Sequence, residues 1–246
     1  LTNLNEPLSP HAEATKRDLV DYLDAVSDRM LPALAGRPLT VKRVLRGQRP
    51  FMQKNAPKYT PDWVRTTPMW AETSQREVHY VLCDDLRTLL WLGNQRAVEY
   101  HPTLGLAENV YRPTHLVLDL DPPDDDFTKV VAVAHLVRRA LADSGLDGAV
   151  KTSGAKGIHV FVPIDDATPV EDVAAATRAL AARAEALDPD IATTAFIVSD
   201  RDGTPQLYRD FLWRLATATK ATVLCTDYRL APEHPFPAAG SQPGTA

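Results

Sequence analysis

Apolar residues recur every three or four positions in four stretches of the chain, a spacing that places them on one face of an α-helix. These stretches predict helices over residues 15–34, 85–95, 128–144 and 170–186. Thr15 stands at the N-cap position of the first helix and Asp18 follows three residues later, as at many helix starts. Gly145 directly follows the third helix and is expected to end it.

Shorter apolar runs bounded by turn residues predict strands. They cover residues 39–43, 78–82, 97–100, 115–120, 149–152 and 158–163. The prolines at 50, 57, 61 and 68 disfavour long regular elements between the first two strands. Because helices and strands mix throughout, and the last two strands flank a glycine-rich loop, the predicted fold class is α+β (α/β mixed). Its central sheet is expected to be mixed, partly antiparallel and flanked by helices.

The strand predicted at 115–120 breaks its apolar pattern with Asp119, and Asp121 follows two residues later. Side chains alternate across a strand, so both carboxylates are expected on one face, with Cα atoms roughly 6.5 to 7 Å apart. Two anions held so close repel each other unless cations lie between them. Carboxylate oxygens suit Mg²⁺ or Mn²⁺, and a pair of such ions catalyses phosphoryl transfer. The alternative is an ordinary capped strand end.

The loop Ser153-Gly-Ala-Lys-Gly157 lies about thirty residues after these acids. Its glycines let backbone amides approach an anion, Ser153 carries a hydroxyl and Lys156 a positive charge. His159 follows on the next predicted strand. The pattern is typical of a phosphate-binding loop, and the alternative is a hairpin turn with a core histidine. Acids and loop together predict a nucleotidyl-transfer site.

Composition and charge narrow the class of protein. The chain has 246 residues, of which 44% are hydrophobic, and a net charge of −5. No run of apolar residues approaches the roughly 18 of a membrane span, and no signal peptide is evident, which predicts a cytoplasmic protein without a membrane partner. The segment 37–65 nevertheless carries eight basic residues against Asp62, with aromatic residues interleaved. It favours a nucleic-acid surface, and a solvated loop is the alternative.

These residues lie in motifs through which the chain resembles the polymerase domain of bacterial ATP-dependent DNA ligase D and its stand-alone relatives, members of the archaeo-eukaryotic primase superfamily. The resemblance runs from residue 1 to about 203. Its motifs, in the order of the family, are TKRDLVDYL (15–23), FMQKNAP (51–57), LLWLGNQRAVEYHP (89–102), LDLDPP (118–123) and KTSGAKGIHVFVP (151–163).

The resemblance implies addition of nucleotides, often ribonucleotides, to a primer or broken DNA end in end-joining repair. It implies two metal ions, Mn²⁺ or Mg²⁺, held by Asp119 and Asp121. The residues that it assigns to the incoming nucleotide are Ser153, Lys156, His159 and His101.

On the DNA side, the resemblance assigns Phe51 and Lys54 to the surface that faces DNA. Lys16 matches a residue that holds the 5′-phosphate of a broken end. Glu6 stands where a second lysine is expected, a reversal of charge that weakens the prediction of tight 5′-phosphate binding.

The C-terminal part departs from the family. A third metal-binding Asp is expected after Arg201-Asp-Gly203, and Asp210 is the candidate; Arg229 is the candidate for an arginine near the triphosphate. The stretch 227–239 instead resembles hormone-sensitive-lipase-type α/β-hydrolases, yet the chain has no Gly-x-Ser-x-Gly elbow. The predicted domains are therefore 1–203, a primase-type polymerase, and 204–246, an atypical segment that completes the same domain or is a fusion or frameshift tail.

The functional prediction is a DNA-directed nucleotidyltransferase. The alternatives are a catalytically impaired DNA-end-binding module and an esterase remnant. The expected partners are DNA, nucleoside triphosphates, and a DNA ligase and an end-binding protein in trans. The expected location is the bacterial cytoplasm, in association with the nucleoid.

Overall fold

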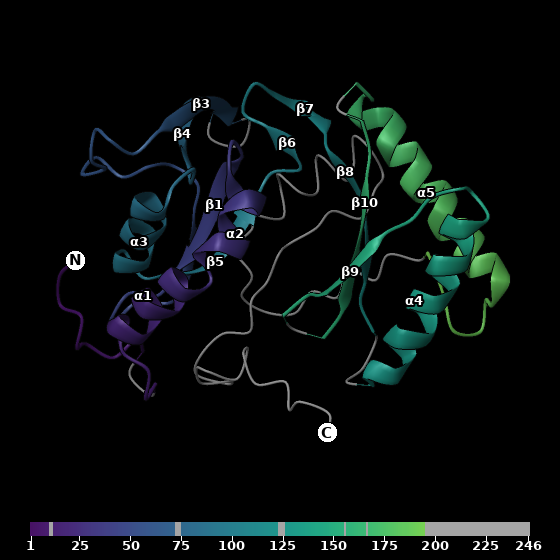
Figure 1. Cartoon of the computed structure of the whole chain (residues 1–246), viewed down its shortest axis with the longest axis horizontal. Helices are drawn as coiled ribbons and strands as arrows, with labels where there is room; N and C mark the ends of the chain where they lie inside the picture. The colour runs from purple at the N-terminus through teal and green to yellow at the C-terminus, as the bar shows by residue number, and fades with distance from the viewer. Residues whose placement is uncertain (10–11, 72–74, 123–125, 155, 166, 195–246) are drawn as a thin grey trace. The chain divides into compact units, whose positions relative to one another are not determined.

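The computed structural model describes residues 1–194, with gaps at 10–11, 72–74, 123–125, 155 and 166. The described residues form two compact units, one from Leu1 to Thr103 and the other from Leu104 to Thr194. Each unit has its own sheets and its own hydrophobic core, so each is described by itself (Figure 1).

The first unit begins with two helices and has a third between its last two strands. Its elements are α1 (Lys16–Ala25), α2 (Ser27–Leu34), β1 (Pro38–Arg43), β2 (Phe51–Gln53), β3 (Thr66–Ala71), β4 (Arg76–Leu82), α3 (Leu86–Asn94) and β5 (Ala97–Pro102). The sheet runs β2-β1-β4-β3, with β5 paired to β1, and every pairing is antiparallel. β1 is thus the strand around which the sheet is organised.

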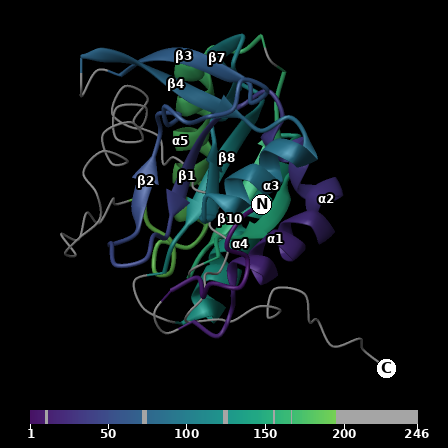
Figure 2. The same ribbon diagram turned by 90° about the vertical axis from the view of Figure 1, so that its left-hand side faces the viewer.

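The core of the first unit lies between this sheet and its helices, which gather beside β1 and β5 (Figures 1 and 2). Leu19 and Leu23 of α1 and Leu89 of α3 are almost completely buried. A side chain at Gly93 would place its Cβ 2.6 Å from Leu23 Cδ1, so the missing side chain lets α1 and α3 pack closely.

The single helix predicted over 15–34 was wrong. It is divided at Val26, whose ψ of 2° is not helical, and Ser27 Oγ donates to Asp24 O at the break. The prolines were expected to disfavour long regular elements, and the region contains two short strands that were not predicted, β2 and β3. Pro68 is accommodated because β3 is an edge strand, where a missing amide costs no ladder hydrogen bond.

The second unit combines two helices with two small sheets in its described residues. Its elements are β6 (Gly105–Leu106), β7 (Asn109–Pro113), β8 (His115–Leu120), α4 (Phe127–Ala142), β9 (Ala149–Thr152), β10 (Ile158–Pro163) and α5 (Val170–Leu187). β6 and β7 form a hairpin, and the other sheet runs β8-β10-β9 with antiparallel pairing throughout.

The helices α4 and α5 cover one face of the β8-β10-β9 sheet (Figure 1). Leu116 and Leu118 of β8 and Val160 of β10 point into the core between the sheet and the helices. Since side chains alternate along a strand, Val117 and Asp119 point to the opposite face. The helices therefore fix which face of the sheet can carry polar chemistry.

The α+β class is confirmed, because helices mix with antiparallel strands in both units. The bounds of β8, β9 and β10 coincide with the predicted strands. Among the described residues, no helix is long and apolar enough to cross a membrane.

Candidate active site

The carboxylate of Asp119 lies on the face of β8 that points away from α4 and α5. It sits opposite His159 in the register of β8 and β10, and His159 Nε2 is 3.4 Å from Asp119 Oδ1. The side chain of Asp119 is 17% exposed. The sheet register thus brings together two of the predicted site residues.

Asp121 follows the end of β8 and lies against the loop between β9 and β10. A Cβ at position 157 would lie 2.5 Å from Asp121 Oδ1 and would also collide with the carbonyl oxygen of Leu120. Only glycine allows the loop to approach the acid so closely. The acids and the glycine-rich loop, predicted from separate motifs, therefore form one site.

The loop itself is closed by Ser153 and Gly157. The Ser153 amide donates to Gly157 O over 2.9 Å, and the Gly157 amide donates to Ser153 Oγ over 3.0 Å. Gly154 has a φ of +90°, a conformation that side chains rarely adopt. Ser153 is buried and Lys156 is exposed, so the hydroxyl shapes the loop while the ammonium group faces outward.

His159 is buried and electrically neutral near pH 7. Burial, together with the charge of Lys151, lowers the pKa of His159 to about 4. Its Nδ1 atom is buried without a hydrogen-bond partner in the described part of the chain. A buried polar atom of this kind is costly in a fold and is typical of a site that binds something.

Asp121 is exposed, yet the protein atoms around it displace enough water to raise the pKa of its carboxyl group. A bound divalent cation would reverse this shift, because it stabilises the carboxylate form. Two hard carboxylates beside a closely packed glycine loop fit Mg²⁺ or Mn²⁺. The described residues contain no cluster of three potential metal ligands, and the predicted third ligand, Asp210, lies outside them.

His101 lies on β5 of the first unit, and its ring contacts an acid of the same strand, Glu99. Its Nε2 is 3.0 Å from Glu99 Oε2, and Lys42 Nζ donates to Glu99 Oε1 over 2.6 Å. Burial by itself would raise the pKa of Glu99, but the hydrogen bonds from His101 and Lys42 hold it below its ordinary value. The predicted nucleotide contact of His101 stays a prediction.

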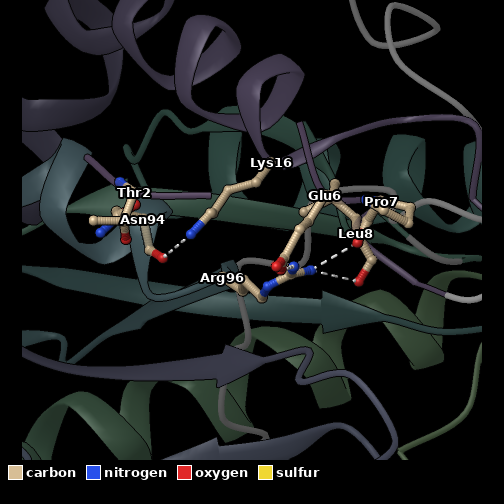
Figure 3. A network of polar contacts seen from close by, with 7 residues as sticks. All are labelled: Thr2, Glu6, Pro7, Leu8, Lys16, Asn94 and Arg96. Atoms are coloured by element: carbon tan, nitrogen blue, oxygen red, sulfur yellow. Dashed lines mark hydrogen bonds and ion pairs between the residues drawn. The ribbon is translucent and has the colours of Figure 1, made fainter. Parts of the chain in front are cut away.

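Lys16 is buried at the start of α1, and its Nζ donates to Asn94 O at the end of α3 over 3.3 Å (Figure 3). Desolvation and the nearby charge of Arg96 lower the pKa of Lys16. Glu6 accepts a hydrogen bond from Arg96 Nη2 over 2.7 Å. The position that departs from the family is therefore occupied by one half of an ion pair.

Sequence reasoning did not find the role of Arg96. This residue is 6% exposed and also donates to Pro7 O and Leu8 O, which fastens residues 6–8 to the turn between α3 and β5 (Figure 3). Its φ of +62° is unusual for a side chain. The spacing between Arg96 and its partners, about ninety residues, leaves no local sequence signal.

Of the remaining predicted site residues, two lie within the part of the chain that the structure describes and two lie outside it. Phe51 is half-buried on β2, where the guanidinium carbon of Arg43 lies 5.8 Å from the ring centroid, and Lys54 follows the strand, also half-buried. Arg229 lies outside the described residues, as does Asp210.

Comparisons with known proteins identify the family. The sequence model described as "LigD, primase-polymerase domain" matches residues 15–231. The chain belongs to the LigD primase-polymerase domain family. The family and the primase-type fold predicted from the motifs are confirmed, and the family supports the predicted nucleotidyltransferase class. The match continues past the domain boundary predicted at residue 203, which stays a prediction.

Among curated proteins, the bifunctional non-homologous end joining protein LigD of Bacillus subtilis is 33% identical over 99% of this chain and 37% of its own length. The multifunctional non-homologous end joining DNA repair protein LigD of Mycobacterium tuberculosis is 32% identical over 91% of this chain and 30% of its own length. The chain thus spans about a third of these relatives.

Among solved structures, the polymerase domain of Mycobacterium tuberculosis ligase D in complex with DNA matches with a TM-score of 0.73 and 31% identity. The match covers 82% of this chain and 73% of that one.

Proposed function

We propose that this chain transfers nucleotides from nucleoside triphosphates to the 3′-hydroxyl of a primer or broken DNA end during end-joining repair. Two divalent cations, Mn²⁺ or Mg²⁺, would be held by Asp119 and Asp121. The β9–β10 loop would hold the triphosphate. DNA and nucleoside triphosphates are the proposed substrates.

The observation that carries this proposal is the contact between Gly157 and Asp121. It brings a loop able to bind phosphate next to a pair of acids able to bind metal, with no room for a side chain between them. Neither half is specific alone, since acids also cap strand ends and glycine loops also turn hairpins. Their juxtaposition is the arrangement that a nucleotidyl transfer requires.

The residues of the site have separable roles. Asp119 and Asp121 supply oxygens of fixed geometry, and the cations bound to them would neutralise the triphosphate and lower the pKa of the attacking hydroxyl. Ser153 and Gly157 hold the loop in shape through their reciprocal hydrogen bonds. Lys156 provides an exposed positive charge for the phosphates.

His159 is the remaining residue of the site formed by the acids and the loop. As a neutral ring beside Asp119 it can donate one hydrogen bond to a phosphate oxygen or to the acid, depending on its tautomer. The 3′-oxygen would attack the α-phosphorus as its proton passes to water, and the bond from the α-phosphorus to the oxygen that bridges to the β-phosphorus would break, which releases pyrophosphate.

The proposal extends to residues that the site geometry does not include. Asp210 would be the third metal ligand, Arg229 and His101 would contact the nucleotide, and Phe51 and Lys54 would face DNA. Lys16 is buried and donates to Asn94 O, so the DNA contact that the resemblance assigns to it is not part of this proposal. A DNA ligase and an end-binding protein are the proposed partners, because the relatives are named as non-homologous end joining proteins. Action on chromosomal ends would place the protein at the bacterial nucleoid.

A primer-extension assay with Mn²⁺ tests the proposal. Asp119→Ala is expected to lower the rate of incorporation on the order of 100- to 1000-fold, because it removes charge stabilisation at the reacting phosphate. The matched control is Asp165→Ala, an exposed acid of the same unit beyond the far end of β10, which should retain the wild-type rate. Extension by Asp119→Ala at the wild-type rate would refute the assignment.

A further inference from the structure

Tyr59 is an exposed aromatic residue held in place by a hydrogen bond. It is 59% exposed, and its hydroxyl accepts from Arg43 Nη1 over 3.1 Å. An exposed ring gains no burial energy within the chain, and a tether on its hydroxyl restricts its rotation. A ring that is both exposed and tethered is suited to stack against a ligand with little loss of conformational entropy.

The tether is rigid because Arg43 is itself buried and anchored. Arg43 is 7% exposed, and its Nε donates to Gln95 O over 2.7 Å. Its Nη2 donates to Gln95 Oε1 over 3.3 Å, and its Nη1 also donates to Gln53 Oε1 over 2.6 Å. These bonds connect β1 with the end of α3 and with β2. Arg43 is therefore part of the scaffold, and its charge is not directed at solvent.

The surroundings of Tyr59 are cationic. Arg43 pairs with Phe51 at the end of the β1–β2 ladder, so the loop that carries the exposed residues Arg46 and Arg49 starts beside the tether. Lys58, also exposed, directly precedes Tyr59. Asp62 is the one acid of the segment 37–65 and is exposed as well.

The other cations of this segment include two that have acidic partners. Lys42 pairs with Glu99 over 2.6 Å, and Arg65 pairs with Asp84 over 2.7 Å. Arg65 is exposed but paired with an acid, whereas Arg37, Arg43 and Lys54 are buried or half-buried. The remaining exposed cations, Arg46, Arg49 and Lys58, belong to the part of the segment next to Tyr59.

We propose that Tyr59 stacks on an unpaired base of the DNA strand, that Arg43 positions its ring, and that Arg46, Arg49 and Lys58 bind the adjacent phosphates. The occupant is single-stranded DNA, since a stacking ring needs a base whose face is not covered by a neighbouring pair. The charge of the phosphates complements the exposed cations. This inference rests on the proposed function, which it deepens by naming the form of DNA end that is bound.

The test is a fluorescence-anisotropy titration in EDTA without nucleotide, on a labelled duplex with a single-stranded overhang and on a blunt duplex of the same sequence. Tyr59→Ala should bind the overhang about 10-fold more weakly, within the roughly 5- to 150-fold range of one base–aromatic contact. Binding of the blunt duplex should change less than about 2-fold, because phosphate contacts dominate there.

Two further variants separate the ring from its tether. Tyr59→Trp also loses the bond to Arg43, but its larger ring stacks more strongly, so it should bind the overhang within about 3-fold of wild type. Tyr59→Phe keeps the ring and loses the bond to Arg43, so about 2- to 5-fold weaker binding is expected from the added cost of ordering the ring. Overhang binding by Tyr59→Phe equal to that of wild type would overturn the positioning role of Arg43.

Tyr111→Ala is the matched control, because Tyr111 is 71% exposed but lies on β7 of the other unit. It should bind like wild type. Salt provides a second readout: Arg49→Ala should reduce the slope of log affinity against log salt by about 1, whereas Tyr59→Ala should leave the slope unchanged.

The inference is overturned if Tyr59→Ala binds the overhang like wild type, or if it loses overhang and blunt duplex equally. It is also overturned if Tyr59→Trp is as weak as Tyr59→Ala. Failure of the proposed function has a different signature, namely wild-type protein that binds DNA but incorporates no nucleotide in the presence of Mn²⁺.

Discussion

The loop between β9 and β10 and the network around Arg96 both hold charged side chains in tight surroundings, but they satisfy these charges differently. Arg96 donates to an acid and to two backbone carbonyls, and Lys16 donates to the end of α3 (Figure 3). At the loop, Asp121 has a raised pKa, and His159 Nδ1 has no hydrogen-bond partner in the part of the chain that is described.

This contrast separates a structural network from a functional one. Buried polar groups that find all their partners within the chain stabilise the fold, because leaving any of them unpaired is costly. A carboxylate with a raised pKa or a buried nitrogen without a hydrogen-bond partner is unfavourable in the free protein. A ligand that supplies the missing positive charge or hydrogen bond stabilises such a group. By this criterion we expect the loop to bind a ligand and the Arg96 network to hold the N-terminal segment in place.

Gly157→Ala is expected to have the largest effect of the variants that test this contrast, and the effect is a loss of primer-extension rate. The added methyl group would push the loop away from Leu120 and Asp121. A displacement of about 1 Å at a reacting group costs roughly 100-fold in rate, and we expect a loss of that size in primer extension.

The control is Gly145→Asn, at the C-terminal end of α4. Gly145 has a φ of +69°, which Asn tolerates, and open space around it. Its rate should equal that of wild type. A Gly157→Ala protein with normal activity would show that the close approach of loop and acid has no role in catalysis.

A smaller effect, on stability alone, is expected from Arg96→Met. The side chain of Met fills similar space but leaves Leu8 O and its neighbours without their donor, so the free energy of unfolding should fall by about 1 to 3 kcal/mol. Urea denaturation measures this loss, and the rate of nucleotide incorporation per folded molecule should not change.

Glu6→Gln is the milder companion variant. The carboxylate of Glu6 is 44% exposed and therefore screened by water, so its removal should cost less than about 1 kcal/mol. If Arg96→Met kept its stability and lost activity instead, the network would be part of the site and the contrast between the two regions would fail.

Local patterns predicted the strands that carry the candidate site, because these strands are close in sequence. The strands β8, β9 and β10 were located by apolar alternation and by the glycine loop, and both motifs carry their own chemistry. Antiparallel pairing of β8 with β10 then places His159 opposite Asp119. The closeness of Asp121 and Gly157 follows from the same pairing.

The rest could not be predicted because it depends on contacts between distant residues. Charge alone does not distinguish Arg43 and Arg96, which are buried, from Arg46 and Arg49, which are exposed. The partners of Arg96 are about ninety positions away. Similarly, β3 was missed because Pro68 argues against a strand unless that strand is known to lie at an edge.

The central claim is that Asp119 and Asp121 hold a divalent cation beside the phosphate-binding loop, and a Mn²⁺ titration followed by calorimetry or electron paramagnetic resonance tests it most directly. The wild-type protein should bind Mn²⁺, more tightly when a nucleoside triphosphate is present. Asp119→Asn and Asp121→Asn should each weaken binding at least about 10-fold, and Asp165→Asn should not. Mn²⁺ binding of equal strength in all four proteins would contradict the account.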